Sequence, residues 1–413
     1  MAHSQRSGTT SSGQIPVLYV DNSSTFGGAI NTLSDVVAEL RSEGVVPIVV
    51  SGQPAAVLHQ LFPDAATYAW EIPVPWVHGP AFRRLLRIAG PARRAAMFLR
   101  GLWWVVRHDL PDAIRLSRLG RRHSVRIVHL NNTCESQLSG LLAARLLGVP
   151  CVAHARGLQS STRGSRMNAA MADVHVAISD VIAGNLRTLR VSDDRIAKVP
   201  DGIRLSEFHT GAPSDGLLRD LGIPEGAPVF GFFGRIVSWK GVREYVDAAA
   251  LVLEALPDAR ALVVGDRSDG DESYAESIVE RVRQLGLEDR ILFTGYRSDV
   301  ADLMRACTVV VHTSLTPEPF GLVVAEALAT GTPVVASDMG GPTEIVDHGE
   351  TGFLVDVRDR EAVAAAVLRL LRNPDDLRRM GAVGRERMEA RYSARQSASA
   401  LLDVYAPLLE KKR

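Results

Sequence analysis

Residues 228–241, with the sequence PVFGFFGRIVSWKG, decide the fold class of this chain of 413 residues. The first six residues are a continuous apolar run, which predicts a strand buried on both faces of a parallel sheet. Gly234 and Gly241 bound the loop that follows, and the amphipathic segment 242–256 predicts a helix. This order of strand, glycine-bounded loop and helix is typical of one unit of a doubly wound α/β sheet.

The same alternation repeats along the chain on both sides of this unit. Strands are predicted at Ile15–Val20, Val46–Val50, Val125–Leu130, Pro150–His154, Val174–Ile178, Ile196–Val199, Pro228–Phe233, Ala261–Gly265, Ile291–Thr294, Thr308–His312 and Pro333–Ala336. Amphipathic segments between them predict helices, among them Gly28–Arg41, Glu272–Leu285 and Glu361–Arg372. The alternation predicts parallel sheets with helices on both faces.

One stretch, from Asp201 to Gly226, is rich in Pro and Gly and interrupts the alternation. We therefore predict two doubly wound domains of similar size, an N-terminal one over 15–205 and a C-terminal one over 206–392. Residues 1–14 are rich in Ser, Thr and Gly and predict a disordered tail rather than a signal peptide. A last helix within 393–413 has no strand after it, so it is free to pack elsewhere.

The composition argues against several classes of protein. The 47 Lys and Arg residues balance 47 Asp and Glu residues, and a zero net charge argues against a general nucleic-acid binder. Three scattered cysteines, Cys134, Cys151 and Cys307, are too few for a disulfide framework or a zinc site, so a reducing, cytoplasmic compartment fits best. No apolar run reaches the roughly 18–20 residues that span a bilayer.

Residues 81–126 depart from this balance. They contain twelve Arg, no Lys and only two acidic residues, Asp109 and Asp112, so their formal net charge is +10. Within them, residues 95–106 are largely apolar and carry Trp103 and Trp104. Three interpretations stay open: peripheral contact with the anionic inner face of a membrane, a solvated basic face with a few core aromatics, and a groove for an acidic acceptor.

Residues 318–326, EPFGLVVAE, contain two carboxylates eight positions apart. Gly321 stands where a helix should begin, and the unpaired backbone N–H groups near Gly321 and Leu322 are typical of a phosphate seat. The preceding strand Thr308–His312 ends here, where open α/β sheets bind ligands. Taken singly, Glu318 and Glu326 are better explained as capping or surface carboxylates.

Arg235 and Lys240 add two cations to the loop between Gly234 and Gly241. A fixed guanidinium and a flexible ammonium together can hold both phosphates of a diphosphate. The helix dipole disfavours cations at a helix start, so their placement there indicates a bound anion. The phosphate seat, the two cations and the two carboxylates together predict a nucleotide-sugar site.

This constellation resembles a known family. Gly-Arg-x4-Lys-Gly at 234–241, followed by Glu-x7-Glu at 318–326, is the pattern of retaining glycosyltransferases of family four. Further matching motifs occur in the same order, at Gly27-Gly28, 199–203 (VPDGI), Val264-Gly265-Asp266, 293–296 (FTGY), 331–335 (GTPVV) and Gly340-Gly341. Asp201 departs from the pattern, since members usually have Asn before this glycine. The resemblance implies the GT-B fold, two Rossmann-like domains facing across a cleft, with a C-terminal helix at 393–413 that crosses back to the N-terminal domain.

The resemblance also implies roles for the matched residues. Arg235 and Lys240 would bind the donor diphosphate, and Glu326 would hydrogen-bond the ribose hydroxyls. Glu318 would face the donor sugar near its C3 hydroxyl, and His154 would contact the sugar near its C6 hydroxyl. The further donor-binding residues are Gly27, Gly28, Gly265, Gly295, Tyr296, Arg297, Phe320, Gly321 and Leu322.

The activity implied is a metal-independent, retaining sugar transfer from a UDP- or GDP-sugar to a carbohydrate, lipid-linked or small-molecule hydroxyl acceptor. Asn131, Asn132 and Glu135 are candidates for contact with that acceptor. Asp269-Gly-Asp271 superficially matches a metal motif of the other glycosyltransferase fold, but is interpreted as a solvated loop. Two alternatives stay open: a nucleotide-sugar epimerase with the same two-domain shape, and a non-catalytic relative that only binds nucleotide-sugar.

Overall fold

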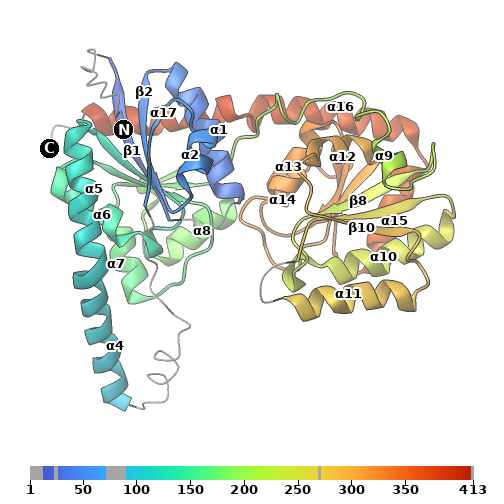
Figure 1. Cartoon of the computed structure of the whole chain (residues 1–413), viewed down its shortest axis with the longest axis horizontal. Helices are drawn as coiled ribbons and strands as arrows, with labels where there is room; N and C mark the ends of the chain where they lie inside the picture. Colours follow the sequence, from blue (N-terminus) through green and yellow to red (C-terminus); the bar gives the residue numbers. More distant parts are fainter. Residues whose placement is uncertain (1–12, 23–26, 71–89, 268–270, 411–413) are drawn as a thin grey trace. The chain divides into compact units, whose positions relative to one another are not determined.

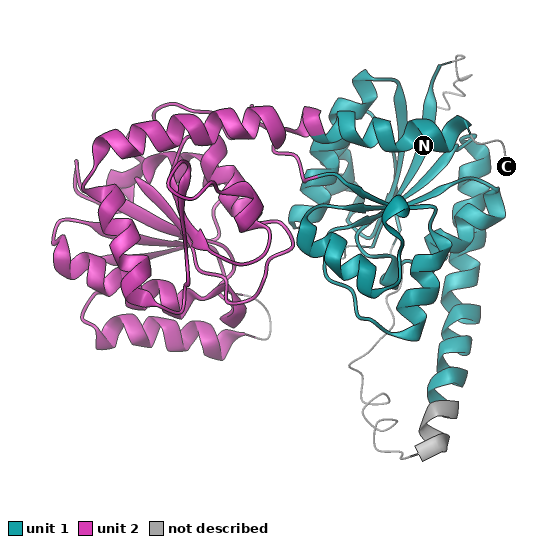
Figure 2. Ribbon diagram, turned by 180° about the vertical axis from the view of Figure 1, so that it is seen from behind, with its two compact units in different colours: residues 1–199, 397–413 teal, residues 200–396 magenta. Residues whose placement is uncertain are grey.

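The computed structural model describes residues 13–22, 27–70, 90–267 and 271–410. The chain divides into two compact units, shown in Figure 2: unit 1 contains residues 1–199 and 397–413, and unit 2 contains residues 200–396. Three sequence predictions fall at least partly outside the described residues. They concern most of the predicted tail, residues 81–89 of the basic segment, and Asp269 of the Asp269-Gly-Asp271 triplet.

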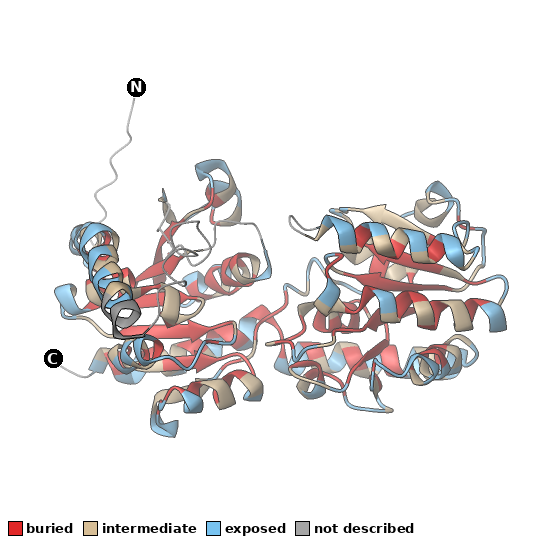
Figure 3. Ribbon diagram, turned by 90° about the horizontal axis from the view of Figure 1, so that it is seen from below, coloured by how far each residue is buried: buried red, intermediate tan, exposed pale blue. Residues whose placement is uncertain are grey.

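Unit 1 is built on a sheet of seven strands in the order β3-β2-β1-β4-β5-β6-β7, and every neighbouring pair is parallel. Its strands are β1 (Ile15–Asp21), β2 (Val45–Ser51), β3 (Ala66–Ala69), β4 (Ile127–Asn131), β5 (Cys151–Ala155), β6 (Val174–Ala177) and β7 (Ile196–Lys198). Most positions of the central strands are buried, as the apolar runs predict. Figure 3 shows these buried strands between helices whose outer faces are exposed.

Helices flank the sheet of unit 1, and one of them, α4, extends away from it (Figure 1). They are α1 (Gly28–Ser42), α2 (Ala55–Leu61), α4 (Gly90–Trp104), the π-helical turn η1 (Val105–Asp109), α5 (Leu110–Arg122), η2 (Cys134–Ser136), α6 (Leu138–Leu147), α7 (Arg163–Met171), α8 (Asp180–Thr188), η3 (Asp193–Arg195) and α17 (Ala394–Glu410). The last helix joins the core of unit 1 through Ala398, Leu401, Tyr405 and Leu408.

Unit 2 is built on a second parallel sheet, of six strands in the order β10-β9-β8-β11-β12-β13. The strands are β8 (Val229–Phe233), β9 (Arg260–Val264), β10 (Ile291–Gly295), β11 (Val309–His312), β12 (Val334–Ser337) and β13 (Gly352–Val355). The helices are α9 (Leu217–Asp220), η4 (Ser238–Lys240), α10 (Val242–Ala255), α11 (Glu272–Gln284), α12 (Val300–Ala306), α13 (Leu322–Ala329), α14 (Pro342–Ile345), α15 (Arg360–Leu371) and α16 (Pro374–Arg391). Two doubly wound Rossmann-like sheets are therefore present, and the predicted fold class is confirmed.

The eleven predicted strands are found within two residues of their predicted ends, and two further strands, β3 and β13, are present. Both additional strands lie at the edge of a sheet. An edge strand is paired on one side only, so it is often short and less uniformly apolar. The sequence pattern of a doubly buried strand is absent from these two segments for this reason.

The boundary between the units lies at 199/200 and 396/397, a few residues from the predicted 205/206 and 392/393. The outgoing and returning segments are hydrogen-bonded to each other, from Ile203 N to Tyr392 O at 2.7 Å and from Ala394 N to Ile203 O at 3.0 Å. Gly202 permits this approach, because a Cβ there would lie 2.5 Å from Ala394 Cα. The glycine after Asp201 is therefore required by packing rather than by a left-handed turn.

Candidate active site

Three loops at the carboxyl ends of β8, β9 and β11 meet so closely that only glycine fits. Gly241 adopts φ +69°, and a Cβ on it would lie 1.9 Å from the carbonyl oxygen of Thr313. A Cβ on Gly265 would lie 2.0 Å from the carbonyl oxygen of Gly234. The loop that carries Arg235 and Lys240 is thus fixed by backbone contacts on both sides, which positions its side chains.

Lys240 and Glu318 meet at this edge of the sheet. The Lys240 ammonium lies 2.6 Å from Glu318 Oε1, and the two side chains are only 14% and 9% exposed. His312 Nε2, at the end of β11, donates to the same oxygen at 2.9 Å, and the Ser314 hydroxyl donates to it as well. The Lys240 ammonium also lies 4.6 Å from the centre of the Trp239 ring. The sequence motifs therefore come together as one buried, charged cluster.

The protonation state of Glu318 follows from these neighbours. Burial raises its pKa, but the charge and hydrogen bond of His312, followed by those of Lys240, outweigh burial and hold the pKa well below the ordinary value of 4.5. Glu318 is therefore a carboxylate throughout the neutral pH range, with three donors on one oxygen. His312 and Ser314 belong to this cluster, although the motifs did not single them out.

The start of α13 lies directly after Glu318. Gly321 caps this helix with φ +106°, a conformation that favours glycine. Gly341 packs against the loop so tightly that a Cβ would lie 1.9 Å from Phe320 O, and its N–H donates to Glu318 O at 2.8 Å. Glu326 follows in the second turn and is half-buried. The predicted phosphate seat is thus a glycine-led helix start beside the Lys240–Glu318 pair.

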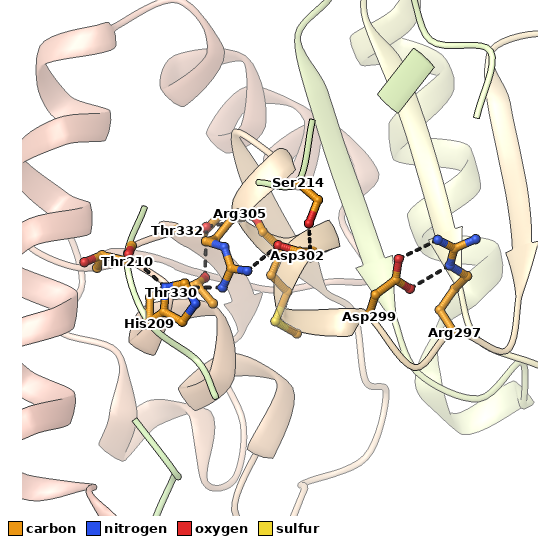
Figure 4. Close-up of polar contacts among 10 residues, drawn as sticks. His209, Thr210, Ser214, Arg297, Asp299, Asp302, Arg305, Thr330 and Thr332 are labelled. Atoms are coloured by element: carbon orange, nitrogen blue, oxygen red, sulfur yellow. Dashed lines mark hydrogen bonds and ion pairs between the residues drawn. The ribbon is translucent and has the colours of Figure 1, made fainter. Parts of the chain in front are cut away.

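The remaining predicted donor contacts of unit 2 are more open. Arg235 is exposed at the beginning of its loop, and Tyr296 is 72% exposed after β10. Arg297 forms a two-point ion pair with Asp299, Nε to Oδ1 at 2.8 Å and Nη2 to Oδ2 at 2.5 Å, as Figure 4 shows. Tyr296, Arg297 and Asp299 line a shallow hollow of about 350 Å³. The Arg297 side chain is thus held by its own loop.

Figure 4 also shows how residues of the interdomain stretch attach to unit 2. Ser214 Oγ donates to Asp302 Oδ2 at 2.6 Å, and Arg305 of α12 contacts both Asp302 and the carbonyl oxygen of His209. This Pro- and Gly-rich stretch is therefore held to α12 by polar contacts, outside the Lys240–Glu318 cluster.

His154, Gly27 and Gly28 belong to unit 1. His154 lies near the carboxyl end of β5 and is 2% exposed. Its Nδ1 lies 3.2 Å from Nε2 of His129, whose Nδ1 lies 2.6 Å from the Tyr405 hydroxyl on α17. Among the described residues, His154 Nε2 is buried and has no hydrogen-bond partner. A buried nitrogen of this kind is a place where a ligand hydroxyl can bind.

Both histidines are neutral near pH 7. Burial lowers the pKa of His129 to about 3, with Arg156 acting in the same direction. Burial, then Arg156 and His129, lower the pKa of His154 well below 6.5. The hydrogen bond between the rings therefore couples their tautomers, because one ring must donate and the other accept.

A polar network missed by the motif analysis surrounds Asp21 at the end of β1. Its carboxylate is fully buried and accepts hydrogen bonds from Ser51 Oγ at 3.0 Å, Asn131 Nδ2 at 2.9 Å and Asn132 Nδ2 at 3.1 Å. Arg156 Nε donates to Asn131 Oδ1 at 2.7 Å. Asp21 follows an apolar run and belongs to none of the sequence motifs. Its position at the end of a strand is the one sequence feature that could have indicated a functional residue.

Two further predicted residues of unit 1, Glu135 and Gly27, differ in their surroundings. The Glu135 carboxylate accepts hydrogen bonds from Ser160 and Ser165 and so anchors the start of α7. Gly27 is extended, with φ −173°, and a Cβ on it would meet no atom of the described residues within 4 Å. The described residues around position 27 therefore do not themselves require a glycine there.

Within the described ranges, no cluster of three or more His, Cys, Asp or Glu side chains is arranged to hold a metal ion. None of the helices in these ranges has the length and apolar character that a bilayer-spanning helix needs.

Comparison with known proteins agrees with this arrangement. Residues 215–387 match the family model "Glycosyl transferases group 1". The α-maltose-1-phosphate synthase of Mycolicibacterium smegmatis is 32% identical over 319 residues, which cover 70% of this chain and 81% of that protein. The chain belongs to the group 1 glycosyltransferases. These are the retaining, family-four enzymes with the GT-B fold, so the family predicted from the motifs is confirmed.

Other similar proteins match a smaller or a larger share of this glycosyltransferase. The D-inositol 3-phosphate glycosyltransferase of Corynebacterium urealyticum is 36% identical over 220 residues, covering 52% of this chain and 51% of that protein. Anabaena HepE in complex with UDP is 23% identical with a TM-score of 0.76, covering 95% of this chain and all of that one. A glycosyltransferase from Rickettsia africae is 20% identical with a TM-score of 0.80, and the match covers 97% of this chain and 100% of that one. These two solved structures show the shared fold.

This glycosyltransferase is therefore an enzyme of the hexosyltransferase type that uses a nucleotide-sugar donor. Membership of this enzyme family argues against both alternatives, the epimerase and the non-catalytic relative.

Proposed function

We propose that this glycosyltransferase transfers a hexosyl group from a UDP- or GDP-sugar to a hydroxyl acceptor with retention, and that Arg235 and Lys240 stabilise the departing diphosphate without a metal ion. The observation that carries the proposal is the Lys240 ammonium, 14% exposed and 2.6 Å from Glu318, beside the glycine-led start of α13. The cation and the helix start suit the two phosphates of such a donor, and the carboxylate suits a hydroxyl of its sugar.

The rate of transfer depends on how well negative charge is stabilised on the diphosphate as the bond to the anomeric carbon breaks. A cation already in place stabilises that growing charge more than it stabilises the ground state. At an effective dielectric constant of about 20, a unit charge at about 4 Å contributes roughly 4 kcal/mol. If half of this arises only as the bond breaks, each cation accelerates transfer roughly 30-fold.

Lys240 can serve the diphosphate and Glu318 at once. An ammonium has three N–H donors, so one can remain on Glu318 while the others turn to phosphate oxygens. In this role Glu318 holds the Lys240 ammonium in place. Arg235, exposed on the same fixed loop, would supply the second cation from a guanidinium that matches phosphate geometry.

We assign Glu318 to sugar binding rather than to covalent attack. Its Oε1 already accepts hydrogen bonds from Lys240, His312 and Ser314, and each of these makes the oxygen a weaker nucleophile. Oε2 would accept from the C3 hydroxyl of the donor sugar. Acceptor attack would then come from the face that the diphosphate leaves, which retains the anomeric configuration.

His154 would bind the C6 hydroxyl of the donor sugar through Nε2. If Tyr405 donates to His129, then His129 donates to His154 Nδ1 and Nε2 carries a proton for the sugar oxygen. If His129 donates to Tyr405, the direction reverses and Nε2 accepts. Tyr405 therefore influences which hydrogen bond His154 offers.

Other donor contacts complete the proposal. Glu326 would bind the ribose hydroxyls, and the main chain of Gly295–Arg297 would meet the base. The remaining donor contacts would come from the backbone around Gly27, Gly28, Gly265, Phe320, Gly321 and Leu322. The acceptor would be a carbohydrate, lipid-linked or small-molecule hydroxyl. The described cysteines are all free and buried, which fits a reducing, cytoplasmic location.

A thermal-shift panel of UDP- and GDP-sugars in EDTA tests the donor assignment. A ligand at 100 times its dissociation constant adds about 2.7 kcal/mol of stability, which shifts the melting temperature measurably. We expect one nucleotide series to stabilise the protein with EDTA present. Stabilisation by neither series, or only after a divalent cation is added, would contradict the proposal.

A further inference from the structure

An exposed apolar surface runs along α4, η1 and the first turns of α5; we define it as Met97, Phe98, Leu99, Leu102, Trp103, Val106, Leu110 and Ile114. Phe98 is 71% exposed, Leu99 62% and Trp103 58%. Single exposed apolar residues are common, but eight of them within 18 positions are unusual. Such a concentration marks a surface that binds something apolar.

Most of these residues share one helical face, although Met97 lies on the opposite side of α4. Leu99, Leu102, Trp103, Val106 and Leu110 recur three or four positions apart, so they form a stripe along the helix axis. Figure 2 shows α4 extending away from the sheet of unit 1, so the stripe lies on a part of the unit that projects outward.

The exposed charge of this segment is entirely positive. The two acidic residues of this segment, Asp109 and Asp112, are only 9% and 5% exposed. Over residues 96–126, the exposed charged residues are all arginines, namely Arg107, Arg115, Arg118, Arg121, Arg122 and Arg126. An apolar stripe flanked by guanidinium groups is complementary to a surface with anionic groups above hydrocarbon.

We propose that the face formed by α4, η1 and α5 binds the surface of an anionic lipid membrane, with the apolar stripe in the interface and the arginines at the phosphate level. Trp103 suits this depth because its ring is apolar and its N–H can remain hydrated. An amphipathic, arginine-rich helix with Trp, Phe and Leu on one face is typical of helices that lie in the membrane plane.

Two other partners fit these observations less well. A second copy of this chain would cover the stripe but would bring two arginine-rich faces together, which like-charge repulsion disfavours. A nucleic acid would match the arginines but would leave Leu99, Leu102 and Val106 against a polar backbone. An anionic lipid surface satisfies both the apolar and the cationic part, independently of the donor chemistry proposed for unit 2.

Cosedimentation of the full chain with vesicles tests the proposal. We expect binding to vesicles of phosphatidylglycerol and phosphatidylcholine at low ionic strength, and much weaker binding to pure phosphatidylcholine or at 0.5 M salt. Phe98→Ser combined with Trp103→Ser should weaken binding at least about 10-fold. Arg107→Gln, Arg118→Gln and Arg122→Gln together should weaken it roughly 100-fold, about five-fold for each arginine.

The matched control is Leu146→Ser combined with Met167→Ser. These side chains are 44% and 69% exposed on α6 and α7 of the same unit, outside the stripe. We expect this variant to bind vesicles as the unchanged protein does, and all variants to keep the same melting temperature within about 2 °C. Failure to bind anionic vesicles at low salt would overturn the proposal. An equal loss of vesicle binding in the control variant would also overturn it. So would a stable dimer of the unchanged protein that becomes monomeric with Phe98→Ser and Trp103→Ser.

Discussion

Lys240 and Glu318 form an ion pair that is largely shielded from water, and this shielding determines how each side chain acts. In such a pair, removal of one partner leaves the other charge buried, which destabilises far more than loss of a surface pair does. In the proposed function the pair also lies at the donor site, so the same two side chains would contribute to stability and to catalysis. Glu318 thus has two measurable effects.

Glu318→Gln should destabilise the protein by roughly 3 kcal/mol at pH 7. The carboxylate has a folded pKa well below its unfolded value near 4.5, so its stabilisation is complete above about pH 5. That stabilisation is lost as the pH falls below 4.5 towards the folded pKa, and the difference between the two proteins should shrink. Urea unfolding at pH 7, 5.5 and 4 measures this difference.

The control for this change is Glu389→Gln, whose ion pair with Arg385 involves a carboxylate that is 52% exposed. It should change stability by less than about 1 kcal/mol. A Glu318→Gln protein as stable as the unchanged one at pH 7 would show that the buried pair does not hold the site together.

Among the elements, the loops at the carboxyl strand ends matter more than the helices for the site. The motifs at 234–241 and 318–326 predicted which residues lie there, because glycine spacing and charge are local features of a sequence. The sequence did not predict β3 and β13, since edge strands lack the pattern of doubly buried ones. It also did not predict the His129–Tyr405 contact, which joins positions 276 residues apart.

Gly341→Ala tests the packing between the 340–341 loop and the loop that carries Glu318. A methyl group at position 341 would lie 1.9 Å from Phe320 O, so the loop must move away from the start of α13. We expect a loss of about 2 kcal/mol in stability and at least about a 10-fold rise in the donor KM.

Gly184→Ala on α8 is the control for this substitution, because a Cβ there meets no atom of the described residues within 4 Å and the site is helical. It should be neutral or slightly stabilising. Equal donor KM values for the two variants would contradict the role given to the 340–341 loop.

Tyr405→Phe tests whether α17 acts on His154 through His129. Removal of the hydroxyl leaves His129 Nδ1 buried without its partner, which should lower stability by about 1–3 kcal/mol. Because the His154 tautomer is then no longer set, we expect kcat/KM for the donor to fall several-fold. Steady-state kinetics measure this effect.

Tyr245→Phe removes an equally buried hydroxyl from unit 2, where it contacts Phe230 O and Leu262 O. It separates general destabilisation from an effect on His154, since it should lower stability with little change in kcat/KM. Unchanged donor kinetics in Tyr405→Phe would exclude Tyr405 as a positioning residue.

On the scale of the whole molecule, the two units differ in how their buried groups respond to acid. Unit 1 contains His129, His154 and His175, and all three are buried. Unit 2 contains the Lys240–Glu318 pair, whose carboxylate stays charged to low pH. Acid should therefore act on unit 1 first.

The buried histidines should lower the stability of unit 1 as the pH decreases from about 6.5, an effect partly offset by Asp109, whose pKa burial raises to about 6. Burial lowers the pKa of His129 to about 3 and of His175 to about 4, so these groups bind a proton first in the unfolded state. Each then removes up to about 1.4 kcal/mol per pH unit between pH 6.5 and its folded pKa. Urea unfolding from pH 7.5 to 4.5 should show this slope, and His175→Gln should reduce it. An unchanged slope in His175→Gln would contradict this explanation.

The most direct test of the leaving-group mechanism is kcat for sugar transfer in EDTA, measured for the unchanged enzyme, for Lys240→Met and for Lys198→Met. Lys198 pairs with Asp180 at 2.9 Å on the surface of unit 1 and serves as the matched control. We predict that the unchanged enzyme and Lys198→Met turn over equally with the chelator present, and that Lys240→Met is slower by roughly 30-fold or more. Full activity of Lys240→Met, or loss of turnover by the unchanged enzyme in EDTA, would contradict the account.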